Sequence, residues 1–559
     1  MGINGVNSLL DISGRSLGVQ SQAIRVIGNN IANVNTPGYS RRRVDIASLE
    51  PATEADAAFG NGATVQQVTR IVDSFINGQL RDKMNERSRA EVRDEFFARA
   101  ENLFGVAGAL PTIGGELSDF FSALDDLAAN PSDISLRSAV IDAGRQLTLT
   151  IRSASEEISG LQRQADNRLG AVVENLNTIS SKLADVNIKI RGTEANGQEN
   201  LALRDQRDEL LRQMSEITTV QTVENSDGSV YVTLPSGFAL VTSTASNALE
   251  LDGSPSFQPV GGYPAGLDGG PLNFIVYDYD PSAGESQINL TDALAAGGGE
   301  LGGLLSLRGI QAATDTSMFD TDGDLVQLGA RIEAIARDLL TRFNQSFVGP
   351  DENGGNPNHQ ASSFDLIDIS SGVYTPTAAF GLFSFAGAAD TGGTLGLADN
   401  TDLTNSGLEN FSSVLEWGVA TPEEFAAGRD LNPALLGVIV TASGDATNIT
   451  TSTGYLGLRA LREQTVNYNV GVFTGTTTLE RLYNDTVTYV GSLRNTAVAE
   501  YESARAQETQ VQEYQNSISG VSLDEEFAKL ILFQKAFEGS ARMIRVGDEL
   551  LDEIIGILS

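Results

Sequence analysis

The sequence contains no cysteine, a single histidine, a single tryptophan and about half as many basic residues as acidic ones. Without cysteine, disulfides, thiolate nucleophiles and cysteine-based metal sites are excluded. The formal net charge of −36 repels phosphate backbones and anionic lipid surfaces, so we expect no nucleic-acid partner. His359 stands in an Asn-Pro-Asn-His stretch without a recognisable Ser–His–Asp set, and no phosphate-binding loop stands out. We therefore expect no enzyme activity and no cofactor.

Long apolar runs and a leader peptide are also missing. No run reaches the ~18 apolar residues that a membrane-spanning helix needs. Residues 1–14 have neither a positive start nor a continuous apolar segment, so we expect no cleaved Sec-type signal. The acidic stretch 320–324 carries Leu325 and Arg331 where an EF-hand loop needs glycine and a final acid, so no metal site is expected.

The beginning of the chain has the apolar spacing of a coiled-coil helix. Steps of three and four residues through 3–34 meet mostly apolar side chains. This helix should end near Asn35, because the following Thr36-Pro37-Gly38 disfavours helix and suits a turn.

The end of the chain has the same spacing. A weak apolar seam over 483–518 stops at Ser519-Gly520, and a stronger one runs through 527–558. Between them, Ser522 and Glu525 have the spacing of a capping box, which predicts the start of the last helix.

The remainder combines helices with a β-rich middle. Residues 64–220 and 325–347 have mostly helical spacing, 229–241 reads as a hairpin, and 351–455 has many turns and short strand signals. The predicted fold class is α+β multidomain, with paired terminal coiled-coil helices, a long-helix bundle domain, and β-rich inserts in the middle of the chain. The predicted domains are a terminal helical assembly domain (1–55 plus 520–559), a mainly helical body with a β-hairpin region near 221–300 (56–350 plus 456–519), and a β-rich insert (351–455).

Two terminal helices invite the interpretation that the ends pair and the middle loops out. Ordering ~70 residues costs on the order of 100 kcal/mol, whereas about 15 buried apolar side chains gain roughly 20–45 kcal/mol. A lone helix pair is therefore marginal. Either the ends become ordered by packing against other copies, or they dock on the helical body of their own chain.

Several segments resemble one known family. Residues 27–40, Ile-Gly-Asn-Asn-Ile-Ala-Asn-Val-Asn-Thr-Pro-Gly-Tyr-Ser, resemble the N-terminal motif of flagellar rod, hook and hook-associated proteins, and 527–558 resembles their C-terminal motif. Residues 519–526, 205–211 and 299–308 are similar to segments of the hook-associated members. The resemblance covers roughly 1–50, 90–345 and 480–559, and leaves the insert unassigned.

The resemblance implies a structural subunit that connects hook to filament and polymerises through its terminal helices. It implies secretion by the flagellar type III apparatus after a transient cytoplasmic stage. The implied partners are copies of the chain, the hook protein, an adjacent hook-associated protein and an export chaperone on the C-terminal helix. The alternatives are another axial subunit, such as a hook or distal rod protein, or a secreted surface enzyme or adhesin that uses the insert.

The candidate interface residues follow from the apolar spacing and the resemblance. On the N-terminal helix they are Ile3, Val6, Leu10, Leu17, Ile24, Ile27, Asn29, Asn30, Ile31, Asn33 and Val34, followed by the turn residues Pro37, Gly38 and Tyr39. On the C-terminal helix, where a chaperone is also expected, they are Phe527, Leu530, Phe533, Phe537, Ile544, Leu551, Ile555 and Leu558. The three asparagines either bond between subunits or bond locally to the backbone. Arg41 to Arg43 either contact acidic surfaces or are solvated.

Overall fold

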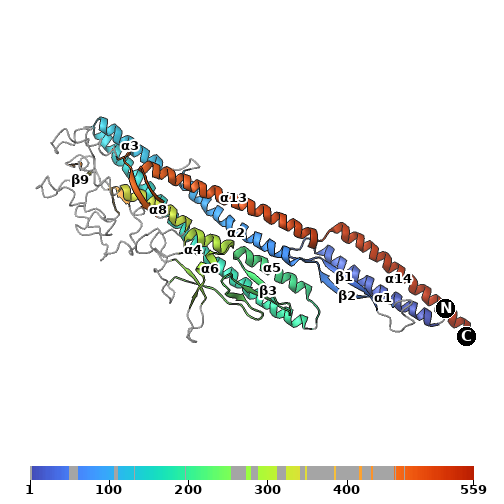
Figure 1. Cartoon of the computed structure of the whole chain (residues 1–559). Coiled ribbons are helices and arrows are strands. Elements are labelled where there is room, and N and C mark those ends of the chain that lie inside the picture. Colours follow the sequence, from blue (N-terminus) through green and yellow to red (C-terminus); the bar gives the residue numbers. More distant parts are fainter. Residues whose placement is uncertain are drawn as a thin grey trace. The chain divides into compact units, whose positions relative to one another are not determined.

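Most of the described chain is helical, as the computed structural model shows (Figure 1). The structure describes residues 3–49, 61–105, 111–130, 133–195, 197–253, 272–277, 287–310, 323–339, 347–348, 383–385, 415–417, 430–431, 459, 461–470 and 473–558. The predicted insert 351–455 lies outside these residues except for strands β10 (Phe383–Phe385), β11 (Leu415–Trp417) and β12 (Asp430–Leu431).

The first and last helices lie side by side, with both chain ends at the same end of the pair (Figure 1). Helix α1 (Ile3–Ala32) packs antiparallel to α14 (Leu523–Leu558). The helix α13 (Leu479–Ser519) ends where predicted, and the Gly520 N–H donates to the Asn516 carbonyl at 2.9 Å. Ser522 precedes α14, and its hydroxyl lies 3.5 Å from the Glu525 N–H.

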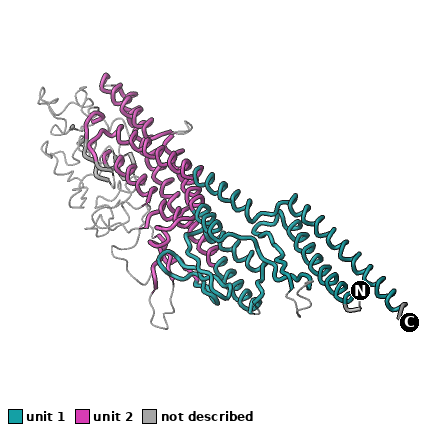
Figure 2. The backbone as a smooth tube through the Cα atoms, turned by 45° about the vertical axis from the view of Figure 1, so that its right-hand side comes forward, with its two compact units in different colours: residues 1–85, 178–247, 503–559 teal, residues 86–177, 248–502 magenta. Residues whose placement is uncertain are grey.

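The chain forms two compact units, each built from separated stretches (Figure 2). Unit 1 contains residues 1–85, 178–247 and 503–559, and unit 2 contains 86–177 and 248–502. The helices α2 (Ser74–Leu103), α4 (Ile134–Glu194) and α13 contribute residues to both units. The domain division expected from the sequence stays a prediction.

Unit 1 joins the terminal helices to a hairpin and a small sheet. The hairpin consists of β1 (Arg42–Ser48) and β2 (Ala63–Arg70), which pair antiparallel with an irregularity at Asp45/Ile46. The prediction of helix from residue 64 was therefore wrong for β2, because an irregular register obscures the alternation of a strand. The sheet β3 (Gln221–Glu224), β4 (Val230–Thr233) and β5 (Ala239–Val241) follows α5 (Leu201–Ile217).

Side chains of α4 and α5 hold this sheet and the turn between the two helices. The Asn187 amide bonds both backbone groups of Val230, at 2.8 and 3.0 Å. Glu194 and Arg204 form an ion pair at 2.8 Å. Burial alone would raise the pKa of the Glu194 carboxyl. The hydrogen bonds from Arg204 and from the Asn200 N–H lower that pKa by more than burial raises it, so the net shift is downward.

Unit 2 has a densely packed helical core. Phe97, Phe120 and Phe121 are fully buried, and Arg308 is buried beside Asp166, with which it forms an ion pair. Its other elements are α3 (Ile113–Ala129), α6 (Thr291–Ala295), α7 (Gly299–Arg308), α8 (Asp324–Asp338), β6 (Glu250–Asp252), β7 (Phe274–Tyr277), β8 (Ile288–Asn289), β9 (Phe347–Val348), β13 (Val466–Val470) and β14 (Phe473–Thr477).

The predicted fold class is confirmed: long helices stand at both ends, helices make up most of the body, and small sheets lie in the middle of the chain. Within the described ranges, no helix has the length and apolar character needed to cross a membrane.

Candidate assembly site at the paired terminal helices

The face of α1 that packs against α14 is a narrow stripe. Val6 and Ile27 are buried, as their positions in the predicted seam require, and Asn30, one residue before the seam position Ile31, is buried as well. Leu10, Leu17, Ile24, Ile31 and Val34 are half-buried at its edges. The buried positions Val19 and Ala23 lie one residue before the predicted ones. The described side chains do not include Ile3.

The candidate residues of α14 differ in burial. Leu530, Phe533, Ile544 and Leu551 are half-buried, and all of them share the face that carries the buried Glu526 and Ser540. Phe527, Phe537 and Ile555 are exposed, and Leu558 has no described side chain.

Within residues 527–558, sequence analysis missed four more exposed apolar side chains. These are Ile531 (60% exposed), Leu532 (65%), Met543 and Val546. None of them lies on the three- and four-residue spacing of the predicted seam, so that spacing does not point to them. Together with Phe527 they form the outward face of α14 as we use the term here.

Asn30 is a hydrogen-bonding hub at the end of α1. Its amide nitrogen donates to the Arg42 carbonyl at 2.9 Å and to Glu526 Oε2 at 2.8 Å. Its amide oxygen accepts from the Tyr39 hydroxyl at 2.8 Å and from the Arg42 N–H at 3.0 Å. An asparagine side chain offers two donors and about two acceptor sites, so the fully buried Asn30 amide is saturated by its own chain.

The other two asparagines of the motif behave differently. The Asn33 side chain donates to the carbonyl of Asn29 at 2.9 Å and accepts from the Thr36 hydroxyl at 3.2 Å, which is local bonding at a helix end. Asn29 itself is exposed. A role for either side chain between subunits stays a prediction.

Arg41 bridges the break between α13 and α14. Its backbone N–H donates to the Ser519 carbonyl at 3.2 Å, while its guanidinium contacts Glu525 at 2.7 Å and Glu526 at 3.1 Å. Lys529 adds a contact to Glu526 at 3.4 Å. The Glu526 carboxylate, 1% exposed, thus has both a charge partner and a hydrogen-bond donor, as a buried charge requires.

Two more arginines fasten the β1–β2 hairpin to α5. Arg42 lies 3.4 Å from Asp205, and Arg70 contacts Asp205 at 3.0 Å and Asp208 at 2.9 Å. Arg43, by contrast, is exposed and pairs with Asp45. The terminal helices are therefore linked through Asn30 and Arg42 to the folded remainder of unit 1.

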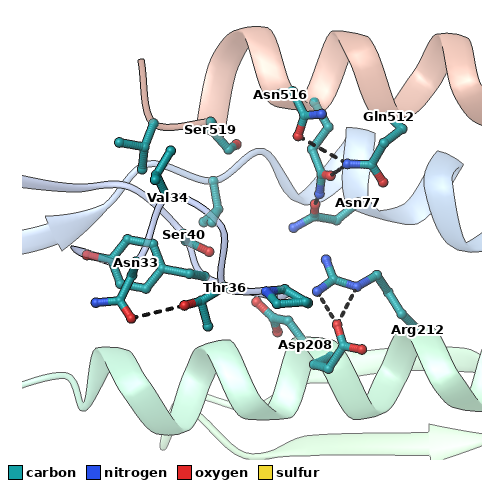
Figure 3. Close-up of a pocket in the computed structure, with 18 of the residues that line it drawn as sticks. Asn33, Val34, Thr36, Ser40, Asn77, Asp208, Arg212, Gln512, Asn516 and Ser519 are labelled. Atoms are coloured by element: carbon teal, nitrogen blue, oxygen red, sulfur yellow. Dashed lines mark hydrogen bonds and ion pairs between the residues drawn. The ribbon is translucent and has the colours of Figure 1, made fainter. Parts of the chain in front are cut away.

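The turn after α1 borders a polar cavity of about 360 Å³. Gly38 adopts a positive φ of 77°, which glycine tolerates best, and follows Pro37 as a turn requires. Figure 3 shows this loop between α13 and α5, with Asn33 bonded to Thr36. Burial raises the pKa of the Tyr39 hydroxyl, with the Arg42 charge opposing, so the hydroxyl remains a donor to Asn30 at neutral pH.

The charged side chains of this region form ion pairs rather than a metal site. Its ionised groups are paired with one another within the chain. Nowhere in the described part of the chain do three or more His, Asp or Glu side chains gather as a metal site would require. The unpartnered feature is instead the outward face of α14.

Comparisons with known proteins agree with this geometry. The family model of the "Flagellar hook-associated protein FlgK helical domain" matches residues 97–355. The model of the "Flagella basal body rod protein" matches 10–39, and that of the "Flagellar basal body rod FlgEFG protein C-terminal" matches 512–557. These two segments contain most of α1 and α14.

The similarity to individual proteins spans almost the entire chain. The chain is 25% identical to flagellar hook-associated protein 1 of Salmonella typhimurium, over 99% of this chain and 100% of that protein. It is 24% identical to the protein of the same name from Bacillus subtilis, over 98% and 97%. The solved structure of the flagellar hook junction protein FlgK from Burkholderia pseudomallei shares the fold, with a TM-score of 0.54, 17% identity, and coverage of 79% of this chain and all of that one. From end to end, the chain is therefore similar to flagellar hook-associated protein 1, and the helical-domain model of that protein matches its middle.

Proposed function

We propose that this chain is a structural subunit that connects the flagellar hook to the filament and polymerises through its terminal helices. The observation that carries the proposal is the outward face of α14. Phe527, Ile531 and Leu532 are 48%, 60% and 65% exposed on one short stretch of helix. Clustered exposed apolar side chains mark surfaces that bind other proteins. The partners we propose are copies of the chain, the hook protein and an adjacent hook-associated protein.

The same face supports a route to the assembly. An exposed apolar helix invites aggregation in the cytoplasm, so we propose that an export chaperone covers α14 there. We further propose that the chain leaves through the flagellar type III apparatus without a cleaved signal, and that its cytoplasmic stage is transient.

The two terminal matches on their own favour any axial subunit, because both carry the names of rod proteins. The match over 97–355 favours the hook-associated position over the hook or the distal rod. Among the described residues of the insert 351–455, none supports the alternative of a surface enzyme or adhesin.

Charge placed on the outward face tests the proposal. Ile531→Asp or Leu532→Asp should give cells with hooks but without filaments, and flagellin should appear in the medium. The purified variants should melt at the temperature of the parent chain, since neither side chain is buried. Gln534→Asp, the same charge at an exposed polar position of α14, is the matched control and should leave normal filaments. Normal filaments with Ile531→Asp and Leu532→Asp would contradict the proposal.

A further inference from the structure

Unit 1 exposes a charged stripe on the last turns of α4. Lys182, Asp185 and Lys189 follow one another at intervals of three and four residues, so they share one face of the helix, and all three are exposed. The nearby Arg191 pairs with Asp227 at 2.9 Å, but within the described part of the chain no ion-pair partner lies beside Lys182 or Lys189. The α4 stripe, as we call these three residues, therefore presents the charges positive, negative, positive to solvent.

A second stripe, with the opposite order of signs, lies on α13. Glu502, Arg505 and Glu513 are exposed, and steps of three and eight residues bring a helix back to nearly the same side. Among the described residues, none of the three has an ion-pair partner. This part of α13 is barely covered by its own chain, because Ala504 is the one buried residue in the range 498–519. The α13 stripe, as we call these three residues, presents negative, positive, negative.

The two stripes carry matching charges but lie on different sides of unit 1. In Figure 1, residues 503–519 of α13 run along one side of the unit and residues 178–194 of α4 along the other, with α5 between them. Helix α5 is joined to the end of α4 by the Arg204–Glu194 ion pair, and it borders the cavity whose opposite wall is α13. The stripes of one chain therefore do not meet, and each finds its complement on a second copy.

The order of the charges decides which faces match. Because positive, negative, positive reads the same in both chain directions, two α4 stripes oppose like charges in either orientation, and so do two α13 stripes. An α4 stripe against an α13 stripe pairs all three charges instead. At about 1.5 Å per residue the stripes are roughly 10 and 16 Å long, a difference that the long lysine and glutamate side chains span. Contact between unlike faces is heterologous, and its repetition generates a ring or a helical array.

We propose that the α4 stripe of one copy docks on the α13 stripe of the next copy in the assembly, with each positive charge facing a negative one. Exposed ion pairs contribute little affinity each, but complementary charges select the partner and its orientation. The stripes therefore set how neighbouring copies align, while the outward face of α14 supplies apolar contact. The inference rests on the proposed function, since it requires copies of the chain to assemble.

Cross-linking in isolated flagella tests this contact directly, because the chain has no cysteine of its own. Thr193→Cys lies on the α4 face one turn after Lys189, and Thr509→Cys lies on the α13 face one turn after Arg505. Both threonines are exposed, and each hydroxyl donates to a carbonyl of its own helix, so the six charges of the stripes stay in place. Helices that face each other lie about 8–10 Å apart, a gap that a short bismaleimide bridges.

The double-cysteine chain should give a ladder of dimers, trimers and larger adducts in denaturing electrophoresis, and neither single variant should. Reversing both lysines, by Lys182→Glu with Lys189→Glu, should lower the adduct yield and the number of filaments per cell by about tenfold or more. Adding Glu502→Lys with Glu513→Lys should restore both to the parent level. The purified variants should melt at the temperature of the parent chain, since all four side chains are exposed.

Ala202→Glu with Gln206→Glu places two negative charges at exposed positions of α5 and is the matched control, which should leave adducts and filaments unchanged. Adducts from a single-cysteine variant would mean that like faces meet, and would overturn the proposal. So would parent yields after reversal of the lysines, or a loss that the opposite substitutions do not repair. The proposed function fails differently: flagella that lack the chain, or normal filaments after its deletion, would overturn that function together with this inference.

Discussion

Replacing Asn30 by aspartate keeps the size of the side chain but removes its two hydrogen-bond donors. Asn30 Nδ2 donates to the Arg42 carbonyl and to Glu526 Oε2, at 2.9 and 2.8 Å. An aspartate oxygen in its place cannot donate a hydrogen bond to the Arg42 carbonyl or to Glu526 Oε2. It also puts a second carboxylate against the buried Glu526.

The size of the effect follows from these contacts. Losing two buried donors costs about 1 kcal/mol each, and more where an acceptor is left unsatisfied. Like charges this close repel strongly until one of them takes up a proton, while Arg41 and Arg42 offset part of the repulsion. We expect the pairing of α1 with α14 to weaken by about 3–5 kcal/mol, the usual cost of disrupting a buried ionic network.

Native-state hydrogen exchange measures this loss where it occurs. Each 1.4 kcal/mol is a factor of ten, so amides of α1 and α14 should exchange at least about 100-fold faster in Asn30→Asp, or lose protection altogether. Asn29→Asp is the matched control, because it adds the same charge to the same end of α1 at an exposed position. Similar exchange rates in the two variants, within about threefold, would refute the role of Asn30 as a hub.

Four further substitutions test other parts of the chain. The pKa of Glu194 is lower in the folded chain than the value of about 4.3 in the unfolded chain, so ionised Glu194 stabilises unit 1 above that pH. This stability is lost as the pH falls through the folded pKa. In Glu194→Gln, the free energy of unfolding should therefore depend less on pH between about pH 5 and 3. Gly38→Ala should destabilise by about 1 kcal/mol or more in urea, because its φ is 77°, whereas Gly18→Ala in α1, with no atom within 4 Å of its added Cβ, should stabilise by about 0.5–1 kcal/mol. Asp166→Asn removes the carboxylate charge beside the fully buried Arg308, so the free energy of unfolding of unit 2 should fall by about 3–5 kcal/mol. In each case an unchanged transition would contradict the stated contact.

The elements at the ends of the chain were predictable because their signals are local. The heptad spacing, the Pro37-Gly38 turn and the Ser522 cap each depend on a few neighbouring residues, and α1, the turn and α14 follow them closely. The faces of the two helices were less predictable. A stripe displaced by one residue, as at Ala23, depends on the partner helix and not on the spacing itself.

The network around Asn30 lay beyond sequence reasoning for a related reason. Its partner Glu526 is almost 500 residues away, and Asp205, which contacts Arg42 and Arg70, comes from a different helix. No spacing rule connects such positions. The same network answers the concern that a lone helix pair is marginal, because it ties the pair to α5 and the hairpin with charged hydrogen bonds.

The most direct test of the proposed role is electron microscopy of the source bacterium after deletion of this chain, together with a blot of the medium for flagellin. Our account predicts complete hooks that carry no filament, with flagellin shed into the medium. Missing hooks would assign the chain to the hook or rod instead, and normal flagella would contradict the structural role itself.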